Sequence, residues 1–268
     1  MTMTSAWPAL RACTVMALHR TWMYRARISL WVFRNLIMLF SLRMIWTAVY
    51  GERETMNGIT LPMMMIYVTI AMLQQYLLEP VAGAEIERRI QRGTIAGDLI
   101  RPVGLIPQIL AYDVGTLLGR IPLVCVVMPF AALIGSLQPP PTVGAAVGYL
   151  ASLILAYVLS TLVWLPVGMV GFWTINVAGI RFLAFSVFGF VSGQMVPLWF
   201  IPEAIRTLLE WLPFQAMVFA PLAIYVGDTT GSDILITLAV QVFWIIVMAW
   251  VVWQLWKHGA NIIQIQGG

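Results

Sequence analysis

The sequence has little charge for its length. Only 10% of its 268 residues are Asp, Glu, Lys or Arg, whereas about a quarter of a soluble domain is charged. Hydrophobic residues make up 61% of the chain, and the mean hydropathy is +0.89. A chain of this composition cannot cover a soluble domain of this size with polar side chains. We therefore predict an integral membrane protein.

Histidine, cysteine and lysine are also scarce. His19 and His258 stand at opposite ends of the chain, and Cys13 and Cys125 are far apart, so neither metal-ligand spacing nor a disulfide framework is present. The only lysine, Lys257, is followed by histidine, whereas a phosphate-binding P-loop ends in Gly-Lys-Ser/Thr. No Ser-His or paired-Asp arrangement stands out. We expect no enzyme activity, and no cofactor or ATP bound by this chain.

Long apolar segments account for most of the sequence. A helix that crosses a membrane needs about 20 mostly apolar residues. This criterion predicts an all-α fold with six transmembrane helices, in which residues 1–268 form a single transmembrane domain. The predicted spans are 28–50, 59–79, 110–135, 143–172, 181–197 and 234–256.

The distribution of basic residues predicts the orientation, because cytoplasmic segments of membrane proteins carry an excess of Lys and Arg. With the N-terminus inside, ten basic residues lie in cytoplasmic segments or at the cytoplasmic edge of a span, and two are external. We therefore predict a plasma (inner) membrane protein with both termini cytoplasmic, surrounded by lipid. The ten are Arg11, Arg20, Arg25, Arg27, Arg88, Arg89, Arg92, Arg101, Arg181 and Lys257, and the two are Arg53 and Arg206. No basic cluster interleaved with aromatics suggests a nucleic-acid partner.

Residues 1–27 contain two tryptophans and four arginines before the first span. This composition predicts a helix that lies on the inner leaflet, although its apolar residues do not form one face. Within the spans, Arg34 and Arg43 either reach an interface or pair with another helix, or else contribute to substrate passage.

The third span is unusual because it is long and charged near its start. Asp113 and Arg120 are seven residues apart and share a helix face. We expect a structural ion pair rather than a proton relay. The span is expected to begin as an interfacial stretch and to enter the bilayer near residue 115.

The outer segment 198–233 contains a strong amphipathic pattern. In 201–212, Ile205 and Leu208 fall on one helix face, whereas Glu203, Arg206 and Glu210 fall on the other. Repeated prolines divide the rest of the segment into short pieces. We expect two short re-entrant helices at the outer interface before the last span; the alternative is a surface loop with one helix.

The most charged segment is 85–101, within the predicted cytoplasmic stretch 80–109. Glu85 precedes Arg89 by four residues, the favourable order for a helical ion pair. Ile86 and Ile90 share a face, and so do Ile95 and Leu99, which predicts a short helix with an apolar ridge. A docking surface needs such a ridge, whereas a loop that only sets topology does not; the latter remains the alternative.

These features together resemble a known family. The six spans, the basic N-terminus, the charged helix after span two and the re-entrant pieces are similar to the permease of a type-2 ABC exporter. The stretch RGTIAGDLIRPV resembles the coupling-helix region of one subfamily, and PLAIYVGD (221–228) resembles the stretch before its last span. The resemblance implies a dimer of permeases, with itself or a homologue, and two cytoplasmic ATP-binding cassette ATPase subunits that bind ATP-Mg. Its implied coupling residues are Glu85, Glu87, Arg88, Arg89, Arg92, Thr94, Asp98 and Arg101.

The resemblance implies ATP-driven export, and the many Met, Trp and Phe residues suit a hydrophobic or amphipathic substrate. The alternative is a channel or secondary transporter that works without an ATPase. Such a protein is expected to show an inverted repeat or pore-lining polar spans, and no convincing repeat is evident between 1–135 and 136–268. An intramembrane enzyme is disfavoured because no catalytic constellation stands out.

Overall fold

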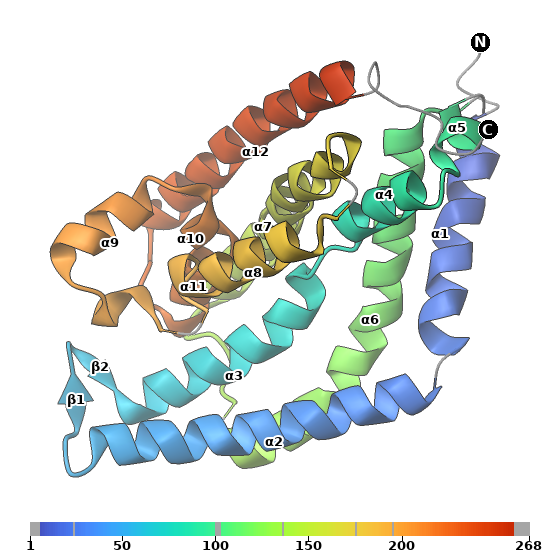
Figure 1. Cartoon of the computed structure of the whole chain (residues 1–268). Helices are drawn as coiled ribbons and strands as arrows, with labels where there is room; N and C mark the ends of the chain where they lie inside the picture. Colours follow the sequence, from blue (N-terminus) through green and yellow to red (C-terminus); the bar gives the residue numbers. More distant parts are fainter. Residues whose placement is uncertain are drawn as a thin grey trace.

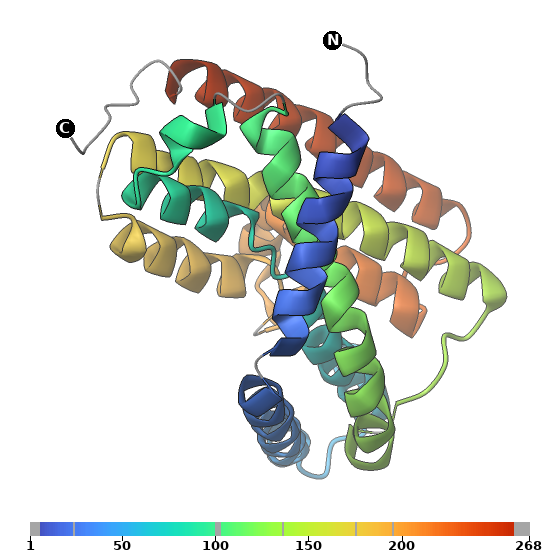
Figure 2. The same cartoon turned by 90° about the vertical axis from the view of Figure 1, so that its right-hand side faces the viewer.

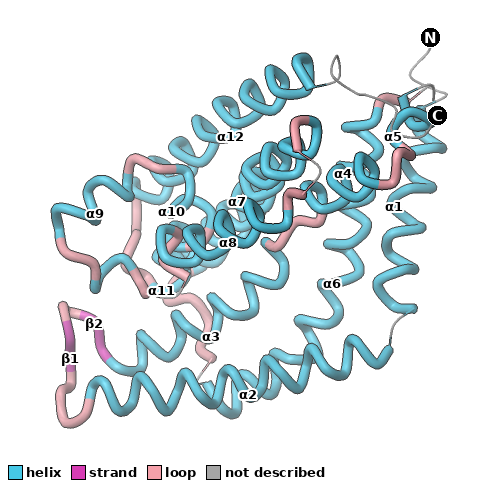
Figure 3. Tube along the Cα trace, viewed as in Figure 1, coloured by secondary structure: helices cyan, strands magenta, loops and turns pink. Residues whose placement is uncertain are grey.

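The computed structural model describes residues 6–23, 25–99, 103–135, 137–174, 176–194 and 196–259, which are almost entirely helical (Figures 1 and 3). The predicted all-α class is confirmed, and the described residues depart from it in one small hairpin of two strands with two residues each. In chain order the elements are α1 (Ala6–Met23), α2 (Arg25–Tyr50), β1 (Thr55–Met56), β2 (Ile59–Thr60), α3 (Leu61–Leu78), α4 (Ala82–Gln91), α5 (Ile95–Leu99), α6 (Leu105–Gly135), α7 (Val143–Met169), η2 (Val170–Phe172), α8 (Ala178–Val191), η3 (Leu198–Phe200), α9 (Glu203–Glu210), α10 (Pro213–Met217), α11 (Phe219–Val226) and α12 (Ser232–Gly259).

Five segments of the described chain are long and apolar enough to cross a membrane. They are Ile28–Tyr50, Leu61–Gln91, Leu105–Leu133, Val143–Phe172 and Ser232–Gly259. The segment predicted as the fifth span, 181–197, is helical only within α8, whose 14 residues extend about 21 Å against a hydrocarbon thickness of about 30 Å. The count of six spans therefore stays a prediction, whereas a multi-pass membrane protein is supported.

The molecule has two distinct ends along the direction of α2 (Figure 1). The β1–β2 hairpin and α9 lie at one end, and α1, α4 and α5 lie at the other. This arrangement agrees with the predicted separation of segments 51–58 and 198–233 from segment 80–109. Which end faces the cytoplasm stays a prediction.

Helix α7 lies at the centre of the bundle and packs against α3, α4, α11 and α12. Tyr67 of α3, Leu159 of α7 and Leu222 of α11 are buried together in the main core. The peripheral helices instead leave large apolar side chains exposed, among them Phe33 on α2, Phe182 on α8 and Leu235 on α12. Broad apolar exposure of this kind suits helices that face lipid.

Helix α1 packs along the first half of α6 (Figures 1 and 2). A Cβ atom added at Gly115 would lie 2.1 Å from the Thr14 carbonyl oxygen, and one at Gly119 would lie 2.8 Å from the Thr21 Cβ. The two glycines form a Gly-x-x-x-Gly pattern, which lets helices approach closely in membranes. The predicted N-terminal helix is present as α1, and it packs on α6 of the same chain. Its placement on the inner leaflet stays a prediction.

Helix α6 spans 31 residues, or about 46 Å, which is longer than a bilayer core requires. It contains Pro122 and Pro129, residues that bend helices. Its first half lies against α1, whereas its later part contacts α2 and α3 (Figures 1 and 2). This length agrees with the prediction that only part of the third span crosses the bilayer.

The segment before α12 forms three short helices, α9, α10 and α11, where two were expected. The alternative of a loop with one helix is wrong. Helix α9 has the predicted amphipathic pattern, and its Ile205 and Leu208 remain exposed. The break between α10 and α11 is buried, and Gln74 and Gln241 donate hydrogen bonds to the carbonyls of Val218 (3.1 Å) and Ala216 (2.8 Å). A helix break inside a membrane protein requires such internal partners. Re-entrance into the membrane itself stays a prediction.

Helix α4 crosses α7 at a pair of glycines. A Cβ atom at Gly168 would lie 2.0 Å from the Gly83 carbonyl oxygen, and one at Gly83 would lie 2.3 Å from the Trp164 carbonyl oxygen. Since both obstructing atoms belong to the backbone, neither can move aside as a side chain could. The absence of side chains at these two positions therefore permits the contact.

We predict that Gly168→Ala destabilises the folded protein by about 2–3 kcal/mol, because the added methyl group must separate α4 from α7. Gly179→Ala is the matched control: an added Cβ there meets nothing within 4 Å, and alanine favours a helix by about 1 kcal/mol. Denaturant unfolding of the detergent-solubilised variants measures the difference. Equal stability of the two variants would contradict the close contact.

Candidate functional site

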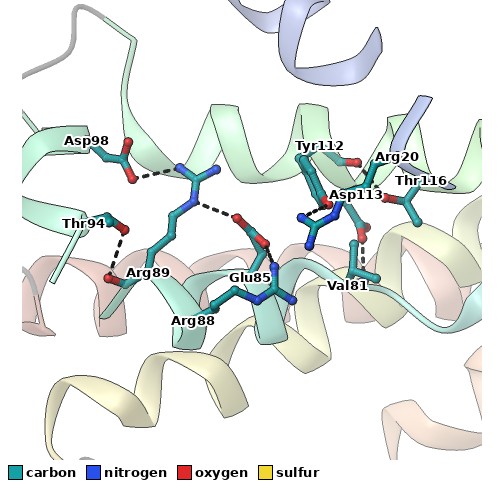
Figure 4. Close-up of polar contacts among 10 residues, drawn as sticks. All are labelled: Arg20, Val81, Glu85, Arg88, Arg89, Thr94, Asp98, Tyr112, Asp113 and Thr116. Atoms are coloured by element: carbon teal, nitrogen blue, oxygen red, sulfur yellow. Dashed lines mark hydrogen bonds and ion pairs between the residues drawn. The ribbon is translucent and has the colours of Figure 1, made fainter. Parts of the chain in front are cut away.

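The charged segment forms two helices, α4 and α5, joined by a turn at residues 92–94 (Figure 4). Gly93 has a φ of +68°, a conformation that glycine adopts without a steric penalty. The helix is interrupted at Gly93, whereas Gly97 lies inside α5. Seven of the eight predicted coupling residues are described in the structure; Arg101 lies outside the described residues.

Ion pairs connect α4 to α5. Glu85 accepts hydrogen bonds from Arg88 and from Nε of Arg89 (3.1 Å), and Nη1 of Arg89 donates to Asp98 (3.1 Å) (Figure 4). The side chains of Glu85, Arg89 and Asp98 are only 11%, 13% and 8% exposed. Removing one member of such a shielded network leaves its partner charge unpaired, which costs about 3–5 kcal/mol. The network therefore holds α5 at a set position relative to α4.

Six of the predicted residues line one hollow of about 240 Å³ between the two helices: Glu85, Arg88, Arg89, Arg92, Thr94 and Asp98. Within it, Arg92 and Thr94 are exposed, and the Arg88 side chain is 36% exposed. The surface available to a partner is therefore basic and hydroxylic, and the acidic residues lie beneath it.

The prediction that the apolar ridge of this segment docks a partner is wrong. Ile86 is fully buried, and it packs with Leu165 and Met169 of α7. Ile90 packs on the same cluster, and Ile95 of α5 is buried in it. Helical periodicity shows that these residues share a face, but it does not show what covers that face. The ridge attaches α4 and α5 to their own membrane domain.

Glu87 connects α4 to α8. Its carboxylate pairs with Arg181 in the first turn of α8 and accepts a hydrogen bond from Gln91 (3.1 Å). The Glu87 side chain is 5% exposed and the Arg181 side chain 42% exposed. The sequence identified Arg181 only as a positive charge that sets topology. The structure shows that it also neutralises a buried carboxylate of α4.

Asp113 of α6 occupies the junction between α3 and α4. It is 2% exposed and accepts hydrogen bonds from the backbone N–H of Val81 (2.7 Å), the Tyr157 hydroxyl (2.7 Å) and the Thr161 hydroxyl (2.9 Å). Val81 is the N-cap residue of α4, directly before its first helical residue. A carboxylate there satisfies a free N–H group and complements the positive end of the helix dipole. Asp113 thereby connects α4 and α6 to α7.

The predicted ion pair between Asp113 and Arg120 is wrong. Arg120 instead donates hydrogen bonds to the backbone carbonyls of Tyr76 (3.1 Å) and Glu79, and its guanidinium lies 4.9 Å from the centre of the Tyr76 ring. These carbonyls lie at the C-terminal end of α3, where a positive charge is favourable. The two charged residues of α6 thus bind opposite helix ends on either side of Pro80.

Sequence reasoning missed the roles of Gly83, Gly168, Tyr157 and Thr161. The Gly-x-x-x-Gly spacing in α6 was a readable signal for close helix contact, but α4 and α7 contribute one glycine each, so no spacing marks their crossing. Among the described residues, no three His, Cys, Asp or Glu side chains gather as a metal site requires. The groups present offer ion pairing and hydrogen bonding.

We predict that Asp113→Ala destabilises the protein by about 3 kcal/mol or more, because three buried donors lose their acceptor. Hydrogen exchange at Val81 is expected to accelerate. Asp113→Asn retains one acceptor oxygen, so its free energy of unfolding is expected to lie between those of the wild type and Asp113→Ala. Asp233→Ala, at the exposed start of α12, is the control and is expected to cost less than about 1 kcal/mol. Equal unfolding free energies for both alanine variants would contradict the role of Asp113.

Comparison with known proteins agrees with this architecture. The search of curated proteins finds no match. Residues 36–267 match the family described as ABC-2 family transporter protein, and the matched range includes α4, α5 and every residue of the site described above. Since the match covers most of the chain, the protein belongs to the ABC-2 transporter family and is an ABC-2 type permease.

Proposed function

We propose that this protein is the membrane-spanning subunit of an ATP-driven exporter, and that α4 and α5 receive the force from a cytoplasmic ATPase. The family match supports a permease that associates with an ATP-binding cassette component. The direction of transport, the substrate and the contact surface are the parts that we propose. The cargo is a hydrophobic or amphipathic molecule, moved outward by two such permeases, and two ATPase subunits bind ATP-Mg.

The observation that carries the proposal is the attachment of α4 to four membrane-domain helices. The Gly83–Gly168 contact attaches it to α7, and the Glu87–Arg181 pair attaches it to α8. Asp113 attaches its first residue to α6, and the Pro80 junction continues directly into α3. A displacement of α4 would therefore move α3, α6, α7 and α8, as a coupling element must.

The exposed face of the segment supports a docking role. Arg92 and Thr94 lie at the turn between α4 and α5, and the shielded pairs beneath them hold that turn in shape. A preorganised surface loses little conformational entropy when it binds. Arg89 and Asp98 are unsuitable probes of docking, because their replacement would break the internal network. Arg92 is the informative position.

We predict that Arg92→Glu weakens association with the ATPase at least about tenfold, because it introduces a like charge beside the carboxylates that this surface is proposed to meet. Arg206→Glu in α9 makes the same charge change at the opposite end of the molecule and serves as the control. The measurement is the yield of Walker-motif ATPase, and of ATP hydrolysis, that co-purifies with the tagged chain.

Normal insertion of both variants must be established first. Full ATPase association by Arg92→Glu would show that the segment sets topology without docking a partner. Saturable transport by the purified chain in vesicles without any ATPase would instead favour the channel or secondary-transporter alternative.

The proposed orientation places both termini and α4–α5 in the cytoplasm. After Cys13 and Cys125 are replaced, we predict that an impermeant thiol reagent labels Arg53→Cys and Arg206→Cys in intact cells. Thr94→Cys is expected to react only after permeabilisation. Labelling of Thr94→Cys from outside would reverse the orientation and remove the basis for an ATPase contact.

A further inference from the structure

We propose that the groove between α3, α4, α7 and α8 is a binding site for protonated amines that carry an apolar body. The groove has a volume of about 170 Å³ and lies where the α3–α4 junction faces the first turns of α8 (Figure 1). It is separate from the hollow on α4 and α5 that the ATPase is proposed to contact. The suggestion that such amines are the transported substrate rests on the proposed function. Binding of amines to the groove is tested independently of that function.

One wall of the groove is aromatic. Trp164 of α7 lies with its ring centre 6.0 Å from that of Phe185 and 5.7 Å from that of Phe188, both on α8. All three side chains line the groove. Ring faces attract cations, Trp most strongly, and they also provide apolar contact area. This wall therefore suits a cation that is attached to an apolar body.

The charges in the groove favour a cation over an anion. Its lining contains two carboxylates, Glu79 and Glu87, and one guanidinium, Arg181. Glu87 and Arg181 neutralise each other. Glu79 therefore gives the lining one carboxylate more than its guanidinium, and Arg120, which is outside the lining, bonds the backbone carbonyl of Glu79 rather than its carboxylate. An incoming ammonium group gains this attraction, whereas a carboxylate would be repelled.

An unpaired acceptor provides a specific partner for an N–H group. The side-chain carbonyl oxygen of Gln75 is buried in the groove lining and accepts no hydrogen bond from the described residues. A buried acceptor without a donor carries a desolvation penalty. A protonated amine in the groove would remove this penalty by donating to Gln75 once the amide turns its oxygen toward the groove, and Glu79 balances the remaining charge.

The test uses three ligands with one ring system: 2-(1-naphthyl)ethylamine, 2-(1-naphthyl)ethanol and 1-naphthaleneacetate. Equilibrium dialysis measures their binding to the purified chain in lipid nanodiscs, with empty nanodiscs to subtract partitioning into lipid. We expect saturable binding of the amine, at least about tenfold weaker binding of the alcohol, and none of the carboxylate.

Gln75→Met, which removes the acceptor at nearly constant volume, is expected to weaken amine binding about tenfold and alcohol binding less, because the hydroxyl donates only a neutral hydrogen bond. Glu79→Gln is expected to weaken amine binding about fivefold. Gln254→Met in α12, away from the groove, is the matched control and is expected to bind the amine normally. Gln75→Met and Glu79→Gln are expected to retain association with the ATPase, since neither Gln75 nor Glu79 belongs to the α4–α5 hollow.

Binding of the amine no greater than to empty nanodiscs, equal binding of amine and carboxylate, or normal amine binding by Gln75→Met would each overturn the proposal. Preferred binding of the carboxylate would identify an anion site at Arg181 instead, and would overturn it too. Because no ATPase is present in this assay, these outcomes are independent of the ATPase association that tests the proposed function.

Discussion

The structure depends on how the break between α3 and α4 is stabilised. Pro80 interrupts the helical hydrogen bonding next to a membrane span, and the freed N–H and carbonyl groups need partners within the protein. Helix α6 supplies both: Asp113 accepts from the first N–H group of α4, and Arg120 donates to the last carbonyls of α3. Each charge faces the helix end of opposite partial charge. Asp113 and Arg120, whose seven-residue spacing suggested an ion pair, thus bind the ends of two different helices.

This junction fixes the relation between the charged segment and the spans. With Val81 fixed at the start of α4, Gly83 meets Gly168 two residues later, and Glu87 reaches Arg181 about one turn of helix beyond Gly83. The ion pairs through Glu85 and Arg89 then orient α5 relative to α4. The junction also closes one side of the amine groove. One break in a helix therefore determines both the surface proposed for the ATPase and the cavity proposed for cargo.

Much of the fold followed from periodicity and composition. The membrane class, five long apolar segments and the amphipathic helix within 201–212 were all predictable, since each depends on residues near one another in sequence. The predicted span 181–197 runs past the end of α8, because apolar residues continue beyond Val191 while the helix ends there. The docking role of Ile86 and Ile90 was misjudged for a related reason, since an amphipathic pattern shows a face but not the element that covers it.

The sequence by itself determined that the chain lies in a membrane, which segments are helical and which stretch concentrates charge, because hydropathy and local propensity act over a few turns of helix. The Glu85–Arg89 pair within α4 followed from its four-residue spacing. Only the tertiary structure decided which charges pair between elements that are distant in sequence. The sequence is equally compatible with Asp113 binding Arg120, a helix end or a hydroxyl group. The position of α6 beside α4 and α7 brings Asp113 to the helix end at Val81 and to the hydroxyls of Tyr157 and Thr161. Partner choice inside a low-dielectric bundle is decided by which buried groups the crossing helices bring within about 3 Å of each other.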